Sequence, residues 1–175
     1  MDESNSNAIP FQEPRFYDTG LDIPEDIRIQ IVELLNQTLA STVDLNSQIL
    51  QAIWHMRGMN FYQFYQLFSK ISEQLQTQIN LLTERIGALA STPLLTVRLA
   101  AQSSQLSEFP FKATTVEELL QALAKQTSSH GKFVRFGIVQ VTDRGDLVTA
   151  QLYIDFSRVV DRHLRLLEAH CRFYR

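Results

Sequence analysis

Apolar residues recur at three- and four-residue intervals over two long stretches in the first half of the chain. These stretches span residues 27–53 and 61–86, and Gly58 lies between them. This spacing places apolar side chains along one face of a helix. Asp22 is expected to cap the first helix, with Pro24 in its first turn. The pattern predicts two long amphipathic helices.

The second half of the chain begins with a weaker pattern. Residues 93–114 carry no long apolar run and predict a crossover with one short helix, after which Thr115 and Glu118 form a Thr-x-x-Glu capping box. Residues 132–141 are rich in β-branched and aromatic side chains, which taken alone favour a strand. A last helical stripe covers 147–167. This layout predicts an all-α, ferritin-like four-helix bundle with a long crossover.

Composition narrows the class of protein. The chain has 175 residues, 45% of them hydrophobic, with 16 basic and 19 acidic side chains. No apolar stretch has the length of a membrane-spanning helix, and the acidic start differs from a secretory signal, so a cytoplasmic protein without membrane contact is expected. The single cysteine, Cys171, excludes a disulfide within the chain. A formal charge of −3 disfavours DNA binding by net positive charge.

The charge distribution suggests two parts. Residues 1–22 are acidic and lysine-free and are expected to form a mobile tail, and residues 23–175 are expected to form the bundle domain. The C-terminal part carries a group of arginines that can bind polyanions weakly, so DNA binding is only weakly supported. This group comprises Arg162, Arg165, Arg172 and Arg175.

Two motifs carry a family resemblance. Residues 54–61 read Trp-x-x-Arg-Gly-x-Asn-Phe, and residues 84–86 read Glu-Arg-Ile. Together with segments at 107–110 and 149–170, these motifs resemble the Dps miniferritins, the DNA-protection-during-starvation family. The resemblance implies a four-helix subunit in which 132–141 is helical, and a hollow homo-dodecameric shell. Such shells oxidise Fe(II), usually with peroxide, and store ferric mineral, with no haem or organic cofactor.

The resemblance also implies a site between two subunits, with histidine and carboxylate ligands. Tyr65 and Ser69 lie one helical turn apart, as do Asn80 and Glu84, so an antiparallel copy would bring the two pairs together. Four positions of the usual centre are substituted, namely Ile53, Tyr65, Ser69 and Asn80. Because Glu84 alone retains the family's ligand type, a weakened or rebuilt centre is expected, with Glu84 as ligand and Asn80 as a weaker one. An interface ion pair is the alternative for Glu84.

The remaining polar residues give further expectations. The resemblance implies a threefold pore lined by acidic residues, where Asp146 remains and Gln151 stands at a position expected to be acidic, so the pore is expected to attract Fe(II) less. It also implies an ion pair between Arg85 and Asp161. His163 can reach inward as a weak ligand of a rebuilt centre, although a surface or interface position is the simpler expectation. The simplest reading of the Ser-Ser-His-Gly sequence around His130 is a solvated histidine.

The leading functional hypothesis is a Dps-like protein that binds and stores iron and protects against oxidative stress. Its ferroxidase centre is expected to be atypical or weakened, and no residue is assigned a catalytic role. The alternative is a catalytically silent shell with a structural, partner or DNA-binding role.

Overall fold

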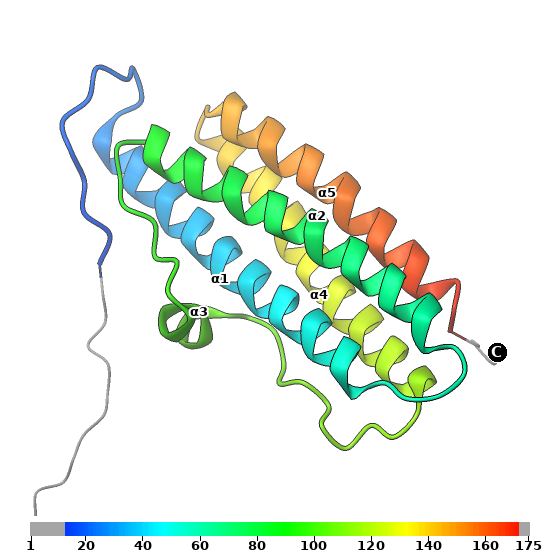
Figure 1. Cartoon of the computed structure of the whole chain (residues 1–175). Helices are drawn as coiled ribbons and strands as arrows, with labels where there is room; N and C mark the ends of the chain where they lie inside the picture. The colour runs from blue at the N-terminus through cyan, green and yellow to red at the C-terminus, as the bar shows by residue number, and fades with distance from the viewer. Residues whose placement is uncertain (1–12, 172–175) are drawn as a thin grey trace, which may run out of the picture.

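Four long helices and one short helix make up the described part of the chain, residues 13–171, in this computed structural model. They are α1 (Glu25–His55), α2 (Phe61–Ala88), α3 (Val97–Ser103), α4 (Val116–Asp143) and α5 (Leu147–Glu168). Figure 1 shows the long helices side by side in a bundle, with α3 on the connection between α2 and α4. The predicted all-α, ferritin-like architecture, including the short crossover helix, is confirmed.

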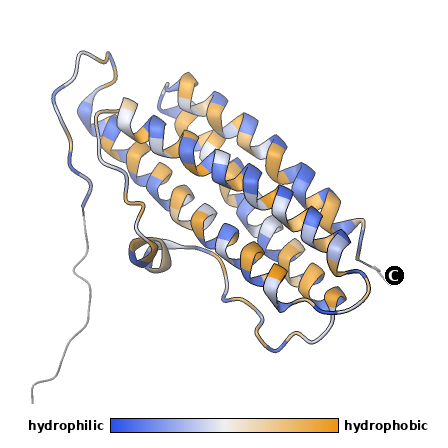
Figure 2. Ribbon diagram, in the orientation of Figure 1, coloured by the Kyte–Doolittle hydropathy of each residue, from blue (hydrophilic) through white to orange (hydrophobic). Residues whose placement is uncertain are grey.

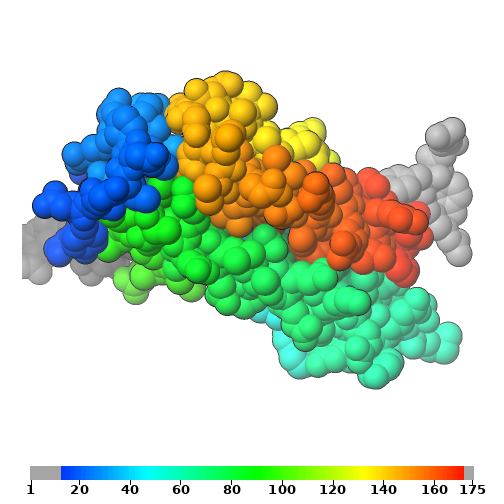
Figure 3. Space-filling view, turned by 90° about the horizontal axis from the view of Figure 1, so that it is seen from above, coloured from blue at the N-terminus to red at the C-terminus, as the bar shows by residue number. Residues whose placement is uncertain are grey.

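The helices pack mainly as two antiparallel pairs, α1 with α2 and α4 with α5. Because the crossover carrying α3 returns the chain to the other end of the bundle, α4 runs in the same direction as α2 (Figure 1). The ribbon in Figure 2 alternates hydrophilic and hydrophobic residues along each long helix, as expected when one face of each is buried. In the space-filling view of Figure 3, α2 and α5 lie side by side on one face of the molecule.

The helix starts follow the sequence signals in α4 and α5. Thr115 Oγ1 accepts a hydrogen bond from the Glu118 amide at 3.2 Å, and the Glu118 carboxylate accepts one from the Thr115 amide at 3.1 Å, which is the predicted capping box. Asp146 caps α5. The prediction for Asp22 was wrong, because the N-cap of α1 is Pro24, which makes no side-chain capping bond.

Residues 132–141 are helical within α4, as the family resemblance implied and against their strand-like composition. Val134, Gly137 and Val141 recur at helical spacing and are buried. A Cβ added to Gly137 would lie 2.5 Å from the Tyr153 ring, so this glycine permits the close approach of α4 to α5. Tertiary packing therefore overrides the local propensity.

Residues 15–17 of the expected mobile tail are held against the bundle. The Tyr17 amide donates to the Ala90 carbonyl at 2.9 Å, and the Thr92 amide donates to the Arg15 carbonyl at 3.0 Å. Phe16 forms an isolated β-bridge with Ser91. Residues 15–17 are thus fixed by backbone hydrogen bonds, and the part of the tail expectation that concerns residues 1–12 lies outside the described residues.

Within residues 13–171, no helix combines the length and the apolar character needed to cross a membrane.

Candidate functional site

The first two positions of the expected metal centre lie where α1 ends and α2 begins. Ile53 is buried, with 3% of its surface exposed, and belongs to the hydrophobic core. Tyr65 is half-buried on α2, with its ring 5.9 Å from that of Phe61. Isoleucine offers no ligand atom, and the Tyr65 ring packs against the hydrophobic core. Apolar contacts therefore dominate at these two positions.

The other three positions follow along α2. Ser69 is half-buried, whereas Asn80 and Glu84 are exposed. The Gln76 side-chain amide donates to Asn80 Oδ1 at 3.1 Å, and the Glu84 carboxylate has no hydrogen bond or ion pair with other residues of 13–171. Tyr65 and Glu84 are separated by nineteen residues of one helix, which is about 28 Å. Within one chain, Tyr65 and Glu84 are therefore too far apart to bind the same metal ion.

The described residues contain no cluster of three or more His, Cys, Asp or Glu side chains that could hold a metal ion. On α2, Asn80 and Glu84 are one turn apart and present one amide and one carboxylate to solvent. A site for a hard divalent ion needs several oxygen ligands and enough negative charge to offset dehydration. The α2 pair supplies part of such a site and needs further ligands from elsewhere.

Asp146 has a structural role in the chain. Its carboxylate is 3% exposed, and the Arg85 guanidinium donates to both of its oxygens at 2.9 and 2.8 Å. The Thr149 amide also donates to it at 3.0 Å. Burial acts to raise the pKa of Asp146, but the hydrogen bonds from Thr149 and Arg85 outweigh it and lower the pKa. Since its charge is already paired inside the bundle, Asp146 does not offer a free carboxylate to a pore.

Gln151, the second expected pore residue, is exposed near the start of α5, where its amide donates to Asp155 at 3.0 Å. The expected ion pair between Arg85 and Asp161 was wrong. Arg85 pairs with Asp146, and Asp161 pairs with Arg135 at 2.7 Å on the exposed side of α4 and α5. The physical reason is that the buried start of α5 leaves Asp146 in need of a cation.

Two histidines lie inside the bundle. His163 is fully buried, and its Nε2 is 2.7 Å from the Gln74 side-chain oxygen. His130 is also fully buried, with Nε2 3.2 Å from Thr42 Oγ1. The expectation of a solvated His130 was therefore wrong, and so was the simpler surface position for His163. Burial is the main cause that lowers the pKa of each imidazole to about 4, with contributions from the charge of His163 on His130 and of Arg162 on His163.

The other histidines and the cysteine make local contacts. His55 Nε2 is 3.0 Å from the Ala113 carbonyl, and His170 Nδ1 is 2.8 Å from the Leu166 carbonyl. Cys171 is buried, and burial together with nearby Glu117 and Glu168 raises its pKa. A thiol held in its protonated form is a poor nucleophile. Of the C-terminal arginines, Arg162 and Arg165 are exposed, whereas Arg172 and Arg175 lie outside the described residues.

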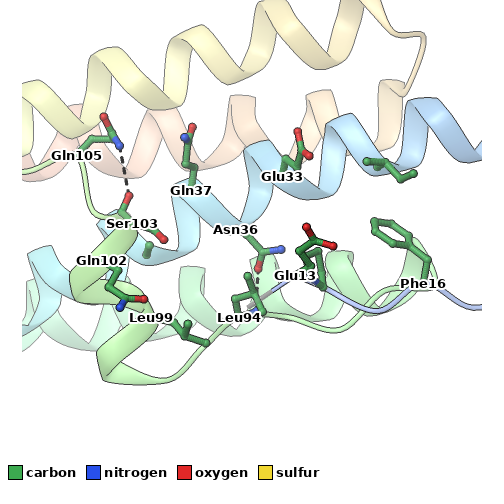
Figure 4. A pocket seen from close by; sticks show the side chains of 13 residues that line it. Glu13, Phe16, Glu33, Asn36, Gln37, Leu94, Leu99, Gln102, Ser103 and Gln105 are labelled. Carbon is green, nitrogen blue, oxygen red and sulfur yellow. Dashed lines mark hydrogen bonds between the residues drawn. The ribbon is translucent and has the colours of Figure 1, made fainter. Parts of the chain in front are cut away.

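A groove of about 760 Å³ lies between α1, α3 and the N-terminal segment (Figure 4). Asn36 stands in it, accepting a hydrogen bond from the Leu94 amide at 2.9 Å, while its Nδ2 is buried and finds no acceptor within 13–171. The carboxylates of Glu13 and Glu33 also line the groove. Sequence reasoning did not find it, because it joins three segments that are distant along the chain.

A model of the ferritin-like domain matches residues 32–174, which is most of the chain. The chain belongs to the ferritin-like family. Within it, the chain is a Dps-type member, because its relatives carry that name. The DNA protection during starvation protein of Agrobacterium fabrum is 28% identical over 152 residues, covering 87% of this chain and 94% of that protein.

Solved structures agree with the Dps-type fold. DpsC from Streptomyces coelicolor superposes with a TM-score of 0.84 at 21% identity, covering 89% of this chain and 91% of that one. A Dps protein from Vibrio cholerae, described as a member of a broad superfamily of ferritin-like diiron-carboxylate proteins, gives a TM-score of 0.78 at 20% identity. It covers 87% of this chain and 98% of that one. The resemblance inferred from the two motifs is thereby confirmed, and the Dps-like stress-protection class is the one that the relatives support.

Proposed function

We propose that this Dps-type chain is the subunit of a cytoplasmic shell that takes up iron and retains it as mineral, with a weakened oxidation centre on α2. Membership of the ferritin-like family supports iron as the substrate, since one structural neighbour is described as a ferritin-like diiron-carboxylate protein. Relatives named for DNA protection during starvation support the stress-protection role.

The observation that carries the proposal is the position of the polar pairs on α2. Asn80 and Glu84 are exposed near its C-terminal end, and Tyr65 and Ser69 are half-buried near its N-terminal end. A second copy running antiparallel along α2 would put each pair opposite the other. Iron would then be held between copies, with the Glu84 carboxylate as the anionic ligand and the Asn80 amide oxygen beside it.

Large exposed aromatic side chains at the end of the bundle where α1 ends and α2 begins support association of copies. Trp54 at the end of α1 is 67% exposed, and Tyr62 at the start of α2 is 70% exposed. Exposed aromatic rings bury a large apolar area when a second copy covers them. We propose a homo-oligomer, and specifically the twelve-subunit hollow shell that the Dps resemblance implies.

The proposed centre is weak for a reason of charge. Each copy supplies one carboxylate, and the remaining positions offer an amide, a hydroxyl, a phenol and an isoleucine. Neutral ligands repay little of the cost of removing water from Fe(II). Oxidation is therefore expected to be slower than at a centre with several carboxylates and histidines.

The test is Fe(II) oxidation by the assembled, metal-free protein, with oxygen and with peroxide, against a protein-free control. Glu84→Gln is expected to abolish the acceleration, and Asn80→Asp is expected to increase it by adding a second carboxylate one turn away. Glu168→Gln is the matched control, because Glu168 is also an exposed helix glutamate but lies at the end of α5.

Acceleration that survives Glu84→Gln would reject the site on α2. No acceleration by the unaltered protein, with none gained in Asn80→Asp, would reject the iron-oxidising function. The second hypothesis, a silent shell with a structural or DNA-binding role, would then take its place, and salt-sensitive retention of DNA would test it.

A further inference from the structure

The groove between α1, α3 and the N-terminal segment contains no residue of the proposed iron centre (Figure 4). One face of α1 contributes to its lining, because Ile29, Glu33, Asn36 and Ala40 recur there at three- and four-residue intervals. Its volume of about 760 Å³ lies within the range of sites for small organic molecules. The groove is therefore a candidate binding site that one subunit forms alone.

Backbone hydrogen bonds hold both walls of the groove in place. On the side of the N-terminal segment, the Arg15 amide donates to Thr92 Oγ1 at 2.9 Å, and the Thr92 amide donates to the Arg15 carbonyl at 3.0 Å. Beyond α3, the Gln105 amide donates to Ser41 Oγ on α1 at 3.1 Å. The walls are thus formed before any ligand arrives, as in most small-molecule sites.

The charge of the groove is negative. Glu13 and Glu33 supply two carboxylates, and the lining has no lysine, arginine or histidine among the described residues. Neither carboxylate forms an ion pair with another residue of 13–171. In Figure 4 both lie at the end of the groove where Asn36 stands. This end attracts a cation and repels an anion.

Asn36 adds a hydrogen-bond donor at the same end. The Leu94 amide donates to Asn36 Oδ1 at 2.9 Å, which fixes the orientation of the side-chain amide. Asn36 is 7% exposed, and its Nδ2 has no acceptor among residues 13–171, although buried donors almost always have one. Because Nδ2 is buried, a ligand reaches it only when exposed side chains of the lining shift. An oxygen of the ligand would then complete its hydrogen bonding.

The rest of the lining is largely apolar. Phe16, Ile29, Leu94 and Leu99 are half-buried and face the groove. These side chains can bury a hydrocarbon chain, which is favourable in proportion to the apolar area removed from water. They offer nothing to a hydrated metal ion, and two carboxylates are few for a hard divalent ion. The lining therefore favours an organic cation over an inorganic one.

We propose that this groove binds an organic amine that carries a carbonyl oxygen. The ammonium group pairs with Glu13 and Glu33, and the carbonyl oxygen accepts a hydrogen bond from Asn36 Nδ2. The hydrocarbon part lies against Phe16 and Leu94. This site goes beyond the proposed iron function, because it uses a different ligand and none of the residues of the centre on α2. Failure of either function would leave the other untouched.

The experiment uses N-acetylputrescine as the probe, because it joins an ammonium group to an acetamide carbonyl through a short aliphatic chain. Saturation-transfer NMR measures its binding to the assembled, full-length, metal-free protein. Saturable binding in the millimolar range is expected for a ligand of this size, at one site per subunit. The matched probe 5-acetamidopentanoate, which has a carboxylate in place of the ammonium group, is expected to show no saturable binding.

Three variants locate the site. Glu33→Gln is expected to weaken binding about fivefold, because an exposed charge-assisted contact is lost. Gln37→Trp fills the groove from an exposed position of its lining and is expected to abolish binding. Glu25→Gln is the matched control, since Glu25 is also an exposed glutamate of α1 but lies outside the lining, and it should leave binding unchanged.

A crystal structure of the probe-treated protein needs no change in the chain. It is expected to place the carbonyl oxygen of the probe within hydrogen-bond distance of Asn36 Nδ2. Density for the probe outside the groove would overturn the proposal. So would the absence of saturable binding by the assembled protein, which is also the result expected if another copy of the chain covers the groove. Equal binding of the anionic probe, or binding that survives both Glu33→Gln and Gln37→Trp, would overturn it as well.

Discussion

The interior of the bundle and the outward part of α2 hold their polar groups in opposite ways. In the interior, His130 and His163 are fully buried, and the Nε2 atom of each has a partner on another helix. On α2, Asn80 and Glu84 are exposed, and Glu84 bonds to nothing else in the described chain. Interior polar groups therefore affect the stability of one subunit, whereas we propose that those on α2 act when a metal ion or another copy meets them.

This difference separates stability from function within one molecule. A change in the interior should be visible in the free energy of unfolding, whether or not metal is present. A change on α2 should be visible in iron chemistry or association and leave unfolding almost unchanged. The following predictions test this separation, from the largest expected effect to the smallest.

The largest effect is expected from acid. The pKa values of His130 and His163 are lowered to about 4 in the folded chain, from about 6.5 when unfolded. Both histidines therefore contribute full stability above pH 6.5, and this is lost as pH falls from 6.5 towards 4, because the unfolded chain binds more protons. The expected loss of unfolding free energy in metal-free protein is on the order of 4 kcal/mol by pH 4.5.

Urea unfolding of the metal-free protein between pH 7.5 and 4.5 measures this slope. His163→Gln is expected to reduce the slope by about half, and His170→Gln to leave it as in the unaltered protein. An unchanged slope in His163→Gln would show that buried imidazoles do not control acid stability.

The second effect compares a buried ion pair with an exposed one. Asp146→Asn leaves Arg85 without its anion at the buried start of α5, at an expected cost of about 3 kcal/mol at pH 7. Asp161→Asn removes a pair whose side chains are 45% and 58% exposed, at an expected cost below about 1 kcal/mol.

Acid gives a further check on Asp146. Its pKa is lowered in the folded chain, so its contribution is complete above the ordinary aspartate range and disappears as pH falls through the lowered value. Denaturant unfolding of Asp146→Asn and Asp161→Asn at pH 7 compares the free energy lost with the buried pair and with the exposed pair. Equal losses would contradict the assignment of Asp146 as a buried structural carboxylate.

The sequence predicted the elements of the fold well because helix periodicity and capping are local signals. The capping box at Thr115 and Glu118 and the short crossover helix both follow from neighbouring residues. Residues 132–141 show the limit, since their composition favours a strand and only the resemblance made them helical. Their state is decided by packing against Tyr153, which is distant in sequence.

The site was harder to predict, because burial and pairing depend on other helices. His130 stands in a polar stretch of sequence, yet the structure buries it against Thr42 and Phe156. Asp146 reads as a free acid at a helix start, but its partner Arg85 is 61 residues away. The α2 positions stay a prediction, because their expected partner is another copy of the chain.

The third prediction compares two glycines, Gly137 in the interior of the bundle and Gly87 on the outward part of α2. Gly137→Ala would force a Cβ to within 2.5 Å of the Tyr153 ring, whose hydroxyl is bonded to Thr38 at 2.7 Å and so resists movement. An expected loss of about 2 kcal/mol follows from overpacking. Gly87→Ala on α2 has no atom within 4 Å of the added Cβ, so a gain of about 0.5 kcal/mol is expected from helix propensity. Thermal unfolding checks both, and equal effects would contradict the close contact of α4 and α5.

The smallest effect is expected at Glu84 itself. Glu84→Gln removes an exposed charge that has no partner in residues 13–171, so the unfolding free energy should change by less than about 0.5 kcal/mol. The same variant is expected to lose Fe(II) oxidation, which is the behaviour of a ligand and not of a structural residue. If Glu84 instead forms an ion pair with another copy, Glu84→Gln would weaken association and lower thermal stability with protein dilution. Sedimentation at several concentrations, measured beside iron oxidation, therefore distinguishes a metal ligand from an interface charge.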